Sequence, residues 1–97
     1  MQTRRIRFNL AADIEERTQF DWFSIARIYE TRGQDEDAMK AYEESIKLDP
    51  TYAKAWFYKA KLHYKLGQKK KAKECVKQVL ELEPDWKKYV EKYMPNL

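Results

Sequence analysis

The sequence predicts an all-α fold, a short α-solenoid of antiparallel helix hairpins, and three observations carry this prediction. Only 2 glycines and 3 prolines occur in 97 residues, so few positions interrupt a helix. Apolar residues recur at the spacing of one helical face. The chain also matches itself at an offset of 34 residues, and a fixed period of this length is typical of stacked helical units.

The N-terminal segment, residues 1–18, is the part whose structure the sequence defines least. We expect a short helix near residues 10–17. One continuous helix from Leu10 to Arg32 is an alternative, because no glycine or proline interrupts that stretch. A further alternative pairs three alternating apolar residues with a second chain, namely Ile6, Phe8 and Leu10.

The first hairpin is predicted over residues 19–52. Its first helix has an apolar stripe at positions i, i+3, i+4 and i+7, formed by Trp22, Ile25, Ala26 and Tyr29. Thr18 followed by Asp21 predicts an N-terminal capping box. Gly33 ends this helix, since glycine adopts the left-handed conformation at low cost. Acidic residues 35–37 then begin the second helix, where they favour its positive end, and Pro50 closes the hairpin.

The second hairpin is predicted over residues 53–85 and repeats this layout. Thr51 is its predicted N-cap, Gly67 separates its helices, and Pro84 closes it. Lysines 69–71 stand where the first hairpin has three acids. Cations are disfavoured at a helix N-terminus, so these lysines either serve an anionic partner or raise solubility.

Eight of 32 positions are identical when residues 19–50 are laid over residues 53–84. The shared pattern resembles the tetratricopeptide repeat, W-x2-L-G-x2-Y, then A-x3-F, then P. The first copy supplies Trp22, Ile25, Ala26, Tyr29, Ala38, Tyr42 and Pro50, and the second supplies Trp56, Lys59, Ala60, His63, Ala72, Val76 and Pro84. Lys59 and His63 depart from the pattern, where the family has apolar and aromatic residues. The resemblance implies a superhelix of two repeats, residues 19–52 and 53–85.

A C-terminal capping helix is predicted over residues 86–94, with Asp85 as its N-cap. Two repeats leave open faces that a solenoid must cover. One stripe of this helix is aromatic and apolar, formed by Trp86, Tyr89, Val90 and Tyr93, while lysines and a glutamate lie off it. It also stands where the first helix of a third repeat would begin.

The residue types exclude most chemistry. No set of convergent nucleophile, base and acid can be assembled, so we predict no enzyme, no cofactor and no metal site. His63 and Cys75 are interpreted as core residues. The chain has no apolar run of the roughly 18 residues that a membrane span needs. A single cysteine fits a reducing compartment, and no secretory signal follows the N-terminal arginines, which together predict a cytoplasmic protein.

The family resemblance implies that the first helices of successive repeats line a concave groove for peptides. Mapped position by position, the candidate peptide-binding residues are Phe20, Phe23, Arg27, Lys54, Phe57, Tyr58, Lys61, Tyr64, Lys65 and Lys88. The groove is therefore predicted to be aromatic and basic. Some of its aromatic side chains serve equally well as packing residues in this family. The asparagines of the family's carboxylate-clamp members are missing, which disfavours a clamp of that kind.

Charge is distributed unevenly along the chain. Residues 1–49 carry 8 basic and 11 acidic side chains, whereas residues 50–97 carry 12 basic and 5 acidic ones. The leading hypothesis is a non-catalytic protein-protein interaction scaffold, which binds an extended or helical, acidic peptide segment of a partner in the basic groove. The alternative is a self-associating assembly module, a homo-oligomer through its end faces or its N-terminal segment. Nucleic acid is a disfavoured partner, because no RNA-binding motif occurs.

Overall fold

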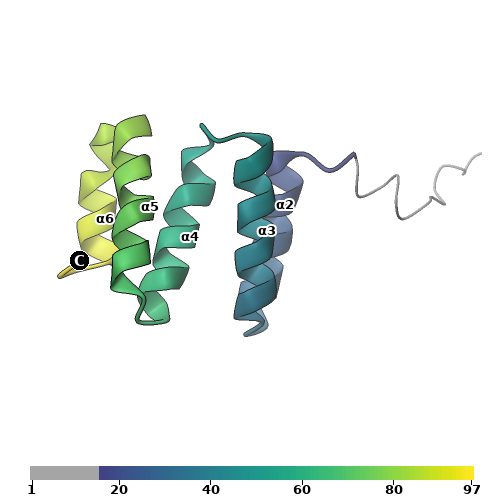
Figure 1. The fold of residues 1–97 in the computed structure, drawn as a ribbon, viewed down its shortest axis with the longest axis horizontal. Helices are drawn as coiled ribbons and strands as arrows, with labels where there is room; N and C mark the ends of the chain where they lie inside the picture. The colour runs from purple at the N-terminus through teal and green to yellow at the C-terminus, as the bar shows by residue number, and fades with distance from the viewer. Residues whose placement is uncertain (1–15) are drawn as a thin grey trace, which may run out of the picture.

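The computed structural model describes residues 16–97, and within them the predicted all-α solenoid is confirmed. The helices are α2 (Gln19–Thr31), α3 (Asp35–Leu48), α4 (Ala53–Lys65), α5 (Lys69–Leu82) and α6 (Lys87–Tyr93), with a 3-10 turn η2 (Pro84–Trp86) before the last. Helices α2 and α3 form one antiparallel pair, α4 and α5 form the next, and α6 follows beside α5 (Figure 1).

The helix ends follow the predicted local rules. The Asp21 amide donates to Thr18 Oγ1 at 3.1 Å, and the Thr18 amide donates to Asp21 Oδ2 at 2.9 Å, which completes the capping box. Gly33 and Gly67 end the first helix of each pair with φ of 78° and 80°. Side chains other than glycine rarely adopt this conformation, so both turns depend on glycine.

Two predicted N-caps are wrong. Thr51 does not cap α4, because its hydroxyl donates to Asp49 Oδ1 at 2.6 Å and Tyr52 is the N-cap residue. Asp85 does not cap the last helix either, because it lies inside η2 and the α-helix begins only at Lys87. Pro84 at the start of η2 fixes this tight turn, since proline cannot donate within a helix but fits its first position.

Of the predictions for residues 1–18, the structure tests only those that concern residues 16–18. Residues 10–15 of the predicted short helix lie outside the described residues, and Glu16 and Arg17 are not helical. Because α2 begins at Gln19 after the Thr18 cap, the continuous helix from Leu10 to Arg32 is wrong. The alternative pairing of Ile6, Phe8 and Leu10 with a second chain also lies outside the described residues.

The core consists of two clusters, each built from one helix pair and the helix that follows it. The first joins α2, α3 and α4 through Phe23, Ala26, Ala38, Ala41, Tyr42, Ala55 and Leu62. The second joins α4, α5 and α6 through Phe57, Ala60, Cys75, Val76, Val79, Val90 and Met94. Alanines at the crossing points allow the backbones to approach, while aromatic rings fill the flanks. Trp22 and Trp56 are half-buried at equivalent edges of the two clusters, as predicted.

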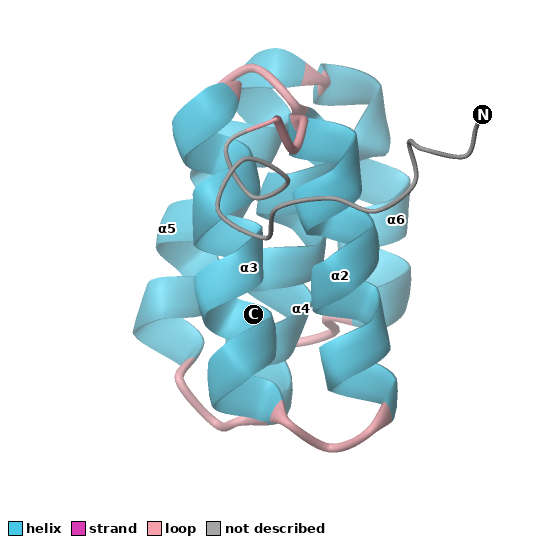
Figure 2. Ribbon diagram, turned by 90° about the vertical axis from the view of Figure 1, so that its right-hand side faces the viewer, coloured by secondary structure: helices cyan, strands magenta, loops and turns pink. Residues whose placement is uncertain are grey.

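The helices form two layers. Viewed along the long axis, α2, α4 and α6 lie on one side, and α3 and α5 lie on the other (Figure 2). The first helices of the successive units therefore share one face, called here the α2–α4–α6 face. All but one of the predicted peptide-binding residues come from α2 or α4, and the last, Lys88, comes from α6.

Candidate functional site

Aromatic rings form the floor of the α2–α4–α6 face. The Phe23 ring packs edge-on against Tyr58 at 5.0 Å and Tyr52 at 5.7 Å between centroids, and it also meets Tyr42 of α3. Phe57 packs edge-on against Tyr58 at 5.9 Å. Phe23 and Phe57 are only 8% and 7% exposed, so the two phenylalanines serve mainly as packing residues.

Three cations of α2 and α4 lie over this aromatic floor. The Arg27 guanidinium is 4.7 Å from the Tyr58 ring centre, and Lys54 Nζ is 5.3 Å from that of Phe23. Lys61 Nζ is 4.6 Å from the ring centre of Tyr58. Cations within about 6 Å of a ring face are attracted by its quadrupole, so these side chains are held close to the floor.

Glu30 neutralises part of this positive charge. Its Oε1 accepts hydrogen bonds from the Tyr42 hydroxyl at 2.7 Å and from Arg27 at 3.1 Å. Lys65 Nζ lies 3.8 Å from Glu30 Oε2 and 3.3 Å from Asp35 Oδ1. Burial, with the Glu30 hydrogen bond, raises the pKa of Tyr42, which therefore stays a neutral donor. Two predicted groove cations, Arg27 and Lys65, therefore already form ion pairs with carboxylates of the chain itself.

Lys54 and Lys61 differ from them, because neither forms an ion pair within residues 16–97. Lys61 is surrounded by rings, with Nζ also 4.6 Å from the Tyr93 ring centre and 5.8 Å from that of Phe57. Burial, followed by the charge of Arg27, lowers the pKa of Lys61, and the charge of Glu30 opposes this shift in part.

A pocket of about 460 Å³ lies between α4 and α6 beside these lysines. It is lined by Lys54, Phe57, Tyr58, Trp86, Tyr89 and Tyr93. Tyr89 and Tyr93 are 43% and 47% exposed, so their rings offer contact area to a ligand. Trp86 of η2 and Tyr89 and Tyr93 of α6 are not among the predicted site residues. The sequence places them on the apolar stripe of a capping helix, and only Val90 of that stripe is buried.

The remaining predicted site residues lie at the margins of the face. Phe20 is exposed and packs edge-on against Tyr52 at 5.1 Å. The Tyr64 hydroxyl donates to the Pro95 carbonyl at 2.7 Å, which ties α4 to the C-terminal residues. Lys88 lies over Tyr89 at 5.3 Å and does not line the pocket. The structure therefore brings most of the predicted α2 and α4 residues together, while Tyr64 at the end of α4 and Lys88 on α6 lie apart from them.

The residues interpreted as core occupy the core. His63 is buried and its Nδ1 lies 2.7 Å from Gln68 Oε1, and burial raises the pKa of the Cys75 thiol. The Lys59 side chain is 18% exposed, and its Nζ lies 5.6 Å from the Trp56 ring centre and 3.7 Å from Glu43 Oε2 of α3. Among the described residues, no group of three or more His, Cys, Asp or Glu side chains could hold a metal ion. No helix in residues 16–97 is long and apolar enough to span a membrane.

Comparison with protein families gives two matches, which overlap. A family model described as TPR repeat matches residues 26–67, and one described as tetratricopeptide repeat matches residues 53–86. The matches include most of both helix pairs and end at η2. No curated protein matches the chain.

Proposed function

We propose that this chain, which belongs to the tetratricopeptide repeat family, binds an acidic and partly apolar segment of a partner protein on its α2–α4–α6 face, without catalysing a reaction. Tetratricopeptide repeats generally mediate protein-protein interaction and typically act as non-catalytic modules. The partner's charge and the face it contacts are the parts of the proposal that rest on this chain's own residues.

The position of Lys54 and Lys61 beside an open aromatic pocket carries the proposal. Both lysines lack a carboxylate partner among the described residues, and Lys54 lines the pocket itself. Lys61 lies against Tyr58 and Tyr93, which line the same pocket. Aromatic anchors in a desolvated pocket and charges at its edge are the usual sources of affinity and specificity in such contacts.

The geometry favours one arrangement of the bound segment. An apolar side chain enters the pocket between α4 and α6, and neighbouring carboxylates meet Lys54 and Lys61. At the other end of the face, Glu30 is only 15% exposed at its side chain and already neutralises Arg27 and Lys65. Glu30 would repel carboxylates of a ligand at that end, so the acidic residues of the ligand lie toward α6.

The test uses a short fluorescein-labelled peptide with a central leucine flanked by glutamates, and fluorescence anisotropy as the measurement. We expect the chain to bind it, and the double variant Lys54→Glu/Lys61→Glu to lose at least about tenfold in affinity. Increasing salt should weaken binding to the unchanged chain, because the two lysines lie at a solvent-accessible edge.

The matched control is Lys70→Glu/Lys77→Glu, which reverses two exposed lysines on α5 in the other layer. It makes the same change in net charge and should leave the affinity close to that of the unchanged chain. Equal losses in both double variants would mean that only net charge matters. Unchanged affinity in Lys54→Glu/Lys61→Glu would remove the groove assignment.

Self-association is a second candidate function, and one observation favours it. Ile28 on α2 is 51% exposed, whereas Leu62, 34 residues later on α4, is fully buried against the first helix pair. An apolar side chain of this kind on an end helix fits stacking against another copy. Sedimentation at low and high protein concentration tests it, and a mass that stays that of one chain would exclude it.

A further inference from the structure

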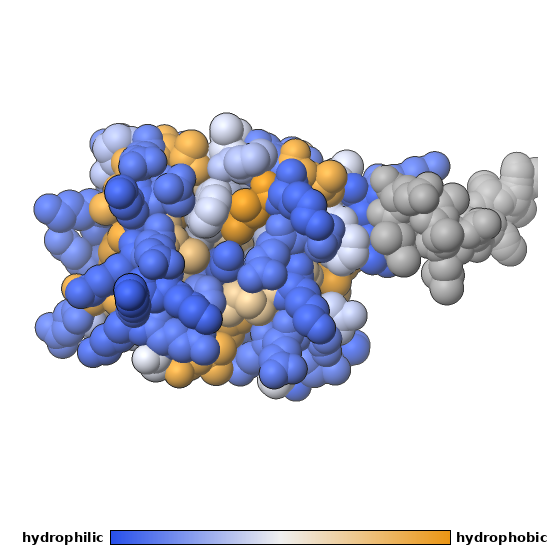
Figure 3. Space-filling view, in the orientation of Figure 1, coloured by the Kyte–Doolittle hydropathy of each residue, from blue (hydrophilic) through white to orange (hydrophobic). Residues whose placement is uncertain are grey.

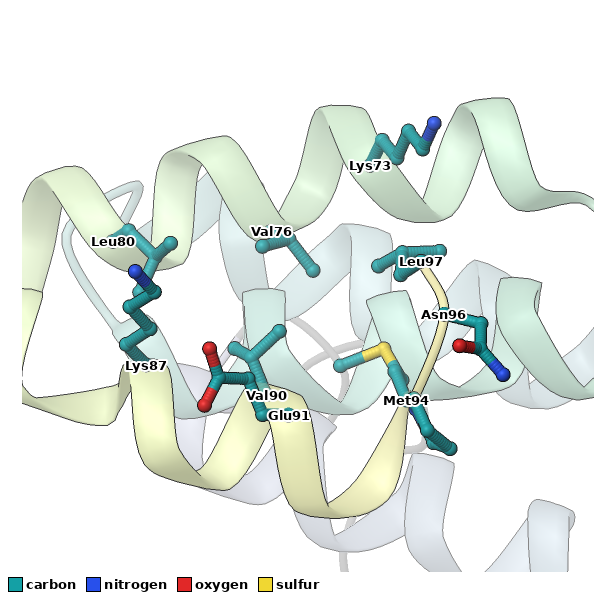
Figure 4. Close-up of a pocket in the computed structure, with 10 residues that line it drawn as sticks. Lys73, Val76, Leu80, Lys87, Val90, Glu91, Met94, Asn96 and Leu97 are labelled. Carbon is teal, nitrogen blue, oxygen red and sulfur yellow. The ribbon is translucent and has the colours of Figure 1, made fainter.

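A cavity of about 500 Å³ lies away from the α2–α4–α6 face, between α5, α6 and the C-terminal residues. Its apolar lining comes from both helices and from the residues after α6, and comprises Val76, Leu80, Val90, Met94 and Leu97. Figure 4 shows these side chains gathered in the space between the two helices, with Lys87 reaching up beside Leu80.

The repeat register explains why this space is apolar. Helix α6 begins at Lys87, 34 residues after Ala53, where α4 begins. Val90 and Met94 therefore correspond to Trp56 and Ala60. In the second helix pair these two α4 residues pack toward Val76 and Val79 of α5. Val90 and Met94 are themselves buried, 7% and 1% exposed, so they form the floor of the cavity, whereas Leu80 and Leu97, which also line it, are half-buried.

The charge around the cavity is mainly positive. Lys73 and Lys87 line it, with Glu91 as the single acid, and neither lysine forms an ion pair within residues 16–97. Exposed lysines continue along α5, where hydrophilic side chains cover the outer surface (Figure 3). Three of them occupy the N-terminal turn of α5, residues 69–71, where the helix dipole disfavours cations. These three lysines do not line the cavity.

We propose that this cavity, called the α5–α6 site, docks an amphipathic helix of a partner protein whose flanks are acidic. The partner helix takes the place beside α6 that α5 holds beside α4, and it lays an apolar stripe on the half-buried Leu80 and Leu97. Its acidic flanks meet Lys73 and Lys87. This site is separate from the peptide-binding face of the proposed function and does not depend on it.

The charges that line the α5–α6 site favour a partner helix over a second copy of the chain as its occupant. A two-fold dimer through the α5–α6 site would bring together two copies of the same lining, each with two lysines and one glutamate, so positive charge would face an excess of positive charge. Like charges brought together at an interface cost binding energy, so a symmetric dimer is disfavoured. A helix with acidic flanks has no such cost and gains two charge-assisted contacts.

The experiment titrates a short helix-stabilised peptide, with leucines at i, i+3, i+4 and i+7 and glutamates on both flanks, into the chain. Methyl NMR is the measurement. We expect the methyl signals of Val76, Leu80 and Leu97 to shift, and Lys73→Glu/Lys87→Glu to weaken binding about tenfold. The same peptide with lysines in place of the glutamates should bind at least about tenfold more weakly.

Two control variants locate the contact. Lys71→Glu changes another α5 lysine that lines a different pocket, with Trp56 and His63, and should leave the affinity unchanged. Lys54→Glu/Lys61→Glu alters only the peptide-binding face and should leave unchanged the affinity that is read from the Val76, Leu80 and Leu97 methyl signals. Three results would each overturn the proposal. The first is signal shifts confined to residues of the α2–α4–α6 face, and the second is equal binding of both peptides. The third is a concentration-dependent dimer of the chain alone that buries these methyl groups.

Discussion

The two ends of the α2–α4–α6 face are built from similar residues, but one end is filled and charge-paired and the other holds an open pocket. Between α2 and α4, rings fill the space around Phe23, and Glu30 with Asp35 neutralises Arg27 and Lys65. Between α4 and α6, the aromatic lining leaves a pocket of about 460 Å³, and Lys61 has no acidic partner in the described structure. The first end satisfies its own charges and rings, and the second leaves them available.

This difference separates stability from binding on one surface. Residues that are buried and mutually satisfied contribute to folding, because their contacts are already made. Residues that are exposed and unpaired contribute to binding, because a ligand supplies what they lack. Substitutions at the α2–α4 end should therefore change the free energy of unfolding, and those at the α4–α6 end should change peptide affinity.

The largest effect is expected from Phe23→Ala. It removes a ring that is 8% exposed and touches three tyrosines, so the free energy of unfolding should fall by about 3 kcal/mol or more. Urea unfolding followed by circular dichroism measures this. Tyr93→Ala is the matched control at the other end and should cost less than about 1 kcal/mol. Similar losses in both variants would show that the two ends do not differ.

Binding should show the reverse order. Tyr93→Ala removes a ring that lines the α4–α6 pocket and lies under Lys61, so affinity for the acidic leucine peptide should fall about tenfold. Phe20→Ala removes an aromatic ring at the α2 end that is 57% exposed, against 47% for Tyr93, and should change the affinity little. Fluorescence anisotropy compares the two. A larger loss from Phe20→Ala would mean that the peptide binds at the α2 end, which contradicts the proposed position between α4 and α6.

Removing the internal carboxylate should make the first end resemble the second. Glu30→Gln keeps an acceptor for the Tyr42 hydroxyl but releases the charge of Arg27, while Lys65 keeps its ion pair with Asp35. Affinity for acidic peptides should rise about threefold, since one more cation becomes available. Asp35→Asn leaves Lys65 paired with Glu30 and should have a smaller effect. A fall in affinity with unchanged folding would contradict the assigned role of Glu30.

A smaller effect is expected from pH. Burial and the charge of Arg27 lower the pKa of Lys61, and a carboxylate ligand binds its charged form. Affinity should therefore fall as pH rises through the lowered pKa of Lys61, which lies below that of an ordinary lysine. Lys61→Arg keeps its charge at these pH values and should remove the decline. The same decline in both proteins would mean that another group is responsible.

The sequence predicted the fold well because local signals and packing agree in it. The stripe of Trp22, the turn glycines and the 34-residue offset all require the same helix pairs. It predicted individual groove residues less completely, because ion pairs depend on side chains from several helices. Glu30 on α2 meets Lys65 from α4 and Tyr42 from α3, and helical spacing does not reveal such a network.

The C-terminal part shows another limit. Trp86, Tyr89 and Tyr93 follow an apolar periodicity that indicates a buried face, and periodicity does not distinguish a core from an open pocket. Their exposure follows from where α6 comes to lie beside α4, after Pro84 forces a tight turn. The apolar space between α5 and α6 has the same origin, since it depends on the placement of α6.

The most direct test of the central assignment, Lys54 and Lys61 as the cations that hold an acidic ligand, is a charge exchange measured by isothermal titration calorimetry. The glutamate-flanked leucine peptide and its lysine-flanked counterpart are each titrated into the unchanged chain and into Lys54→Glu/Lys61→Glu. We expect the unchanged chain to prefer the glutamate peptide and the double variant to prefer the lysine peptide. If the double variant keeps the original preference, the ligand carboxylates do not contact these lysines.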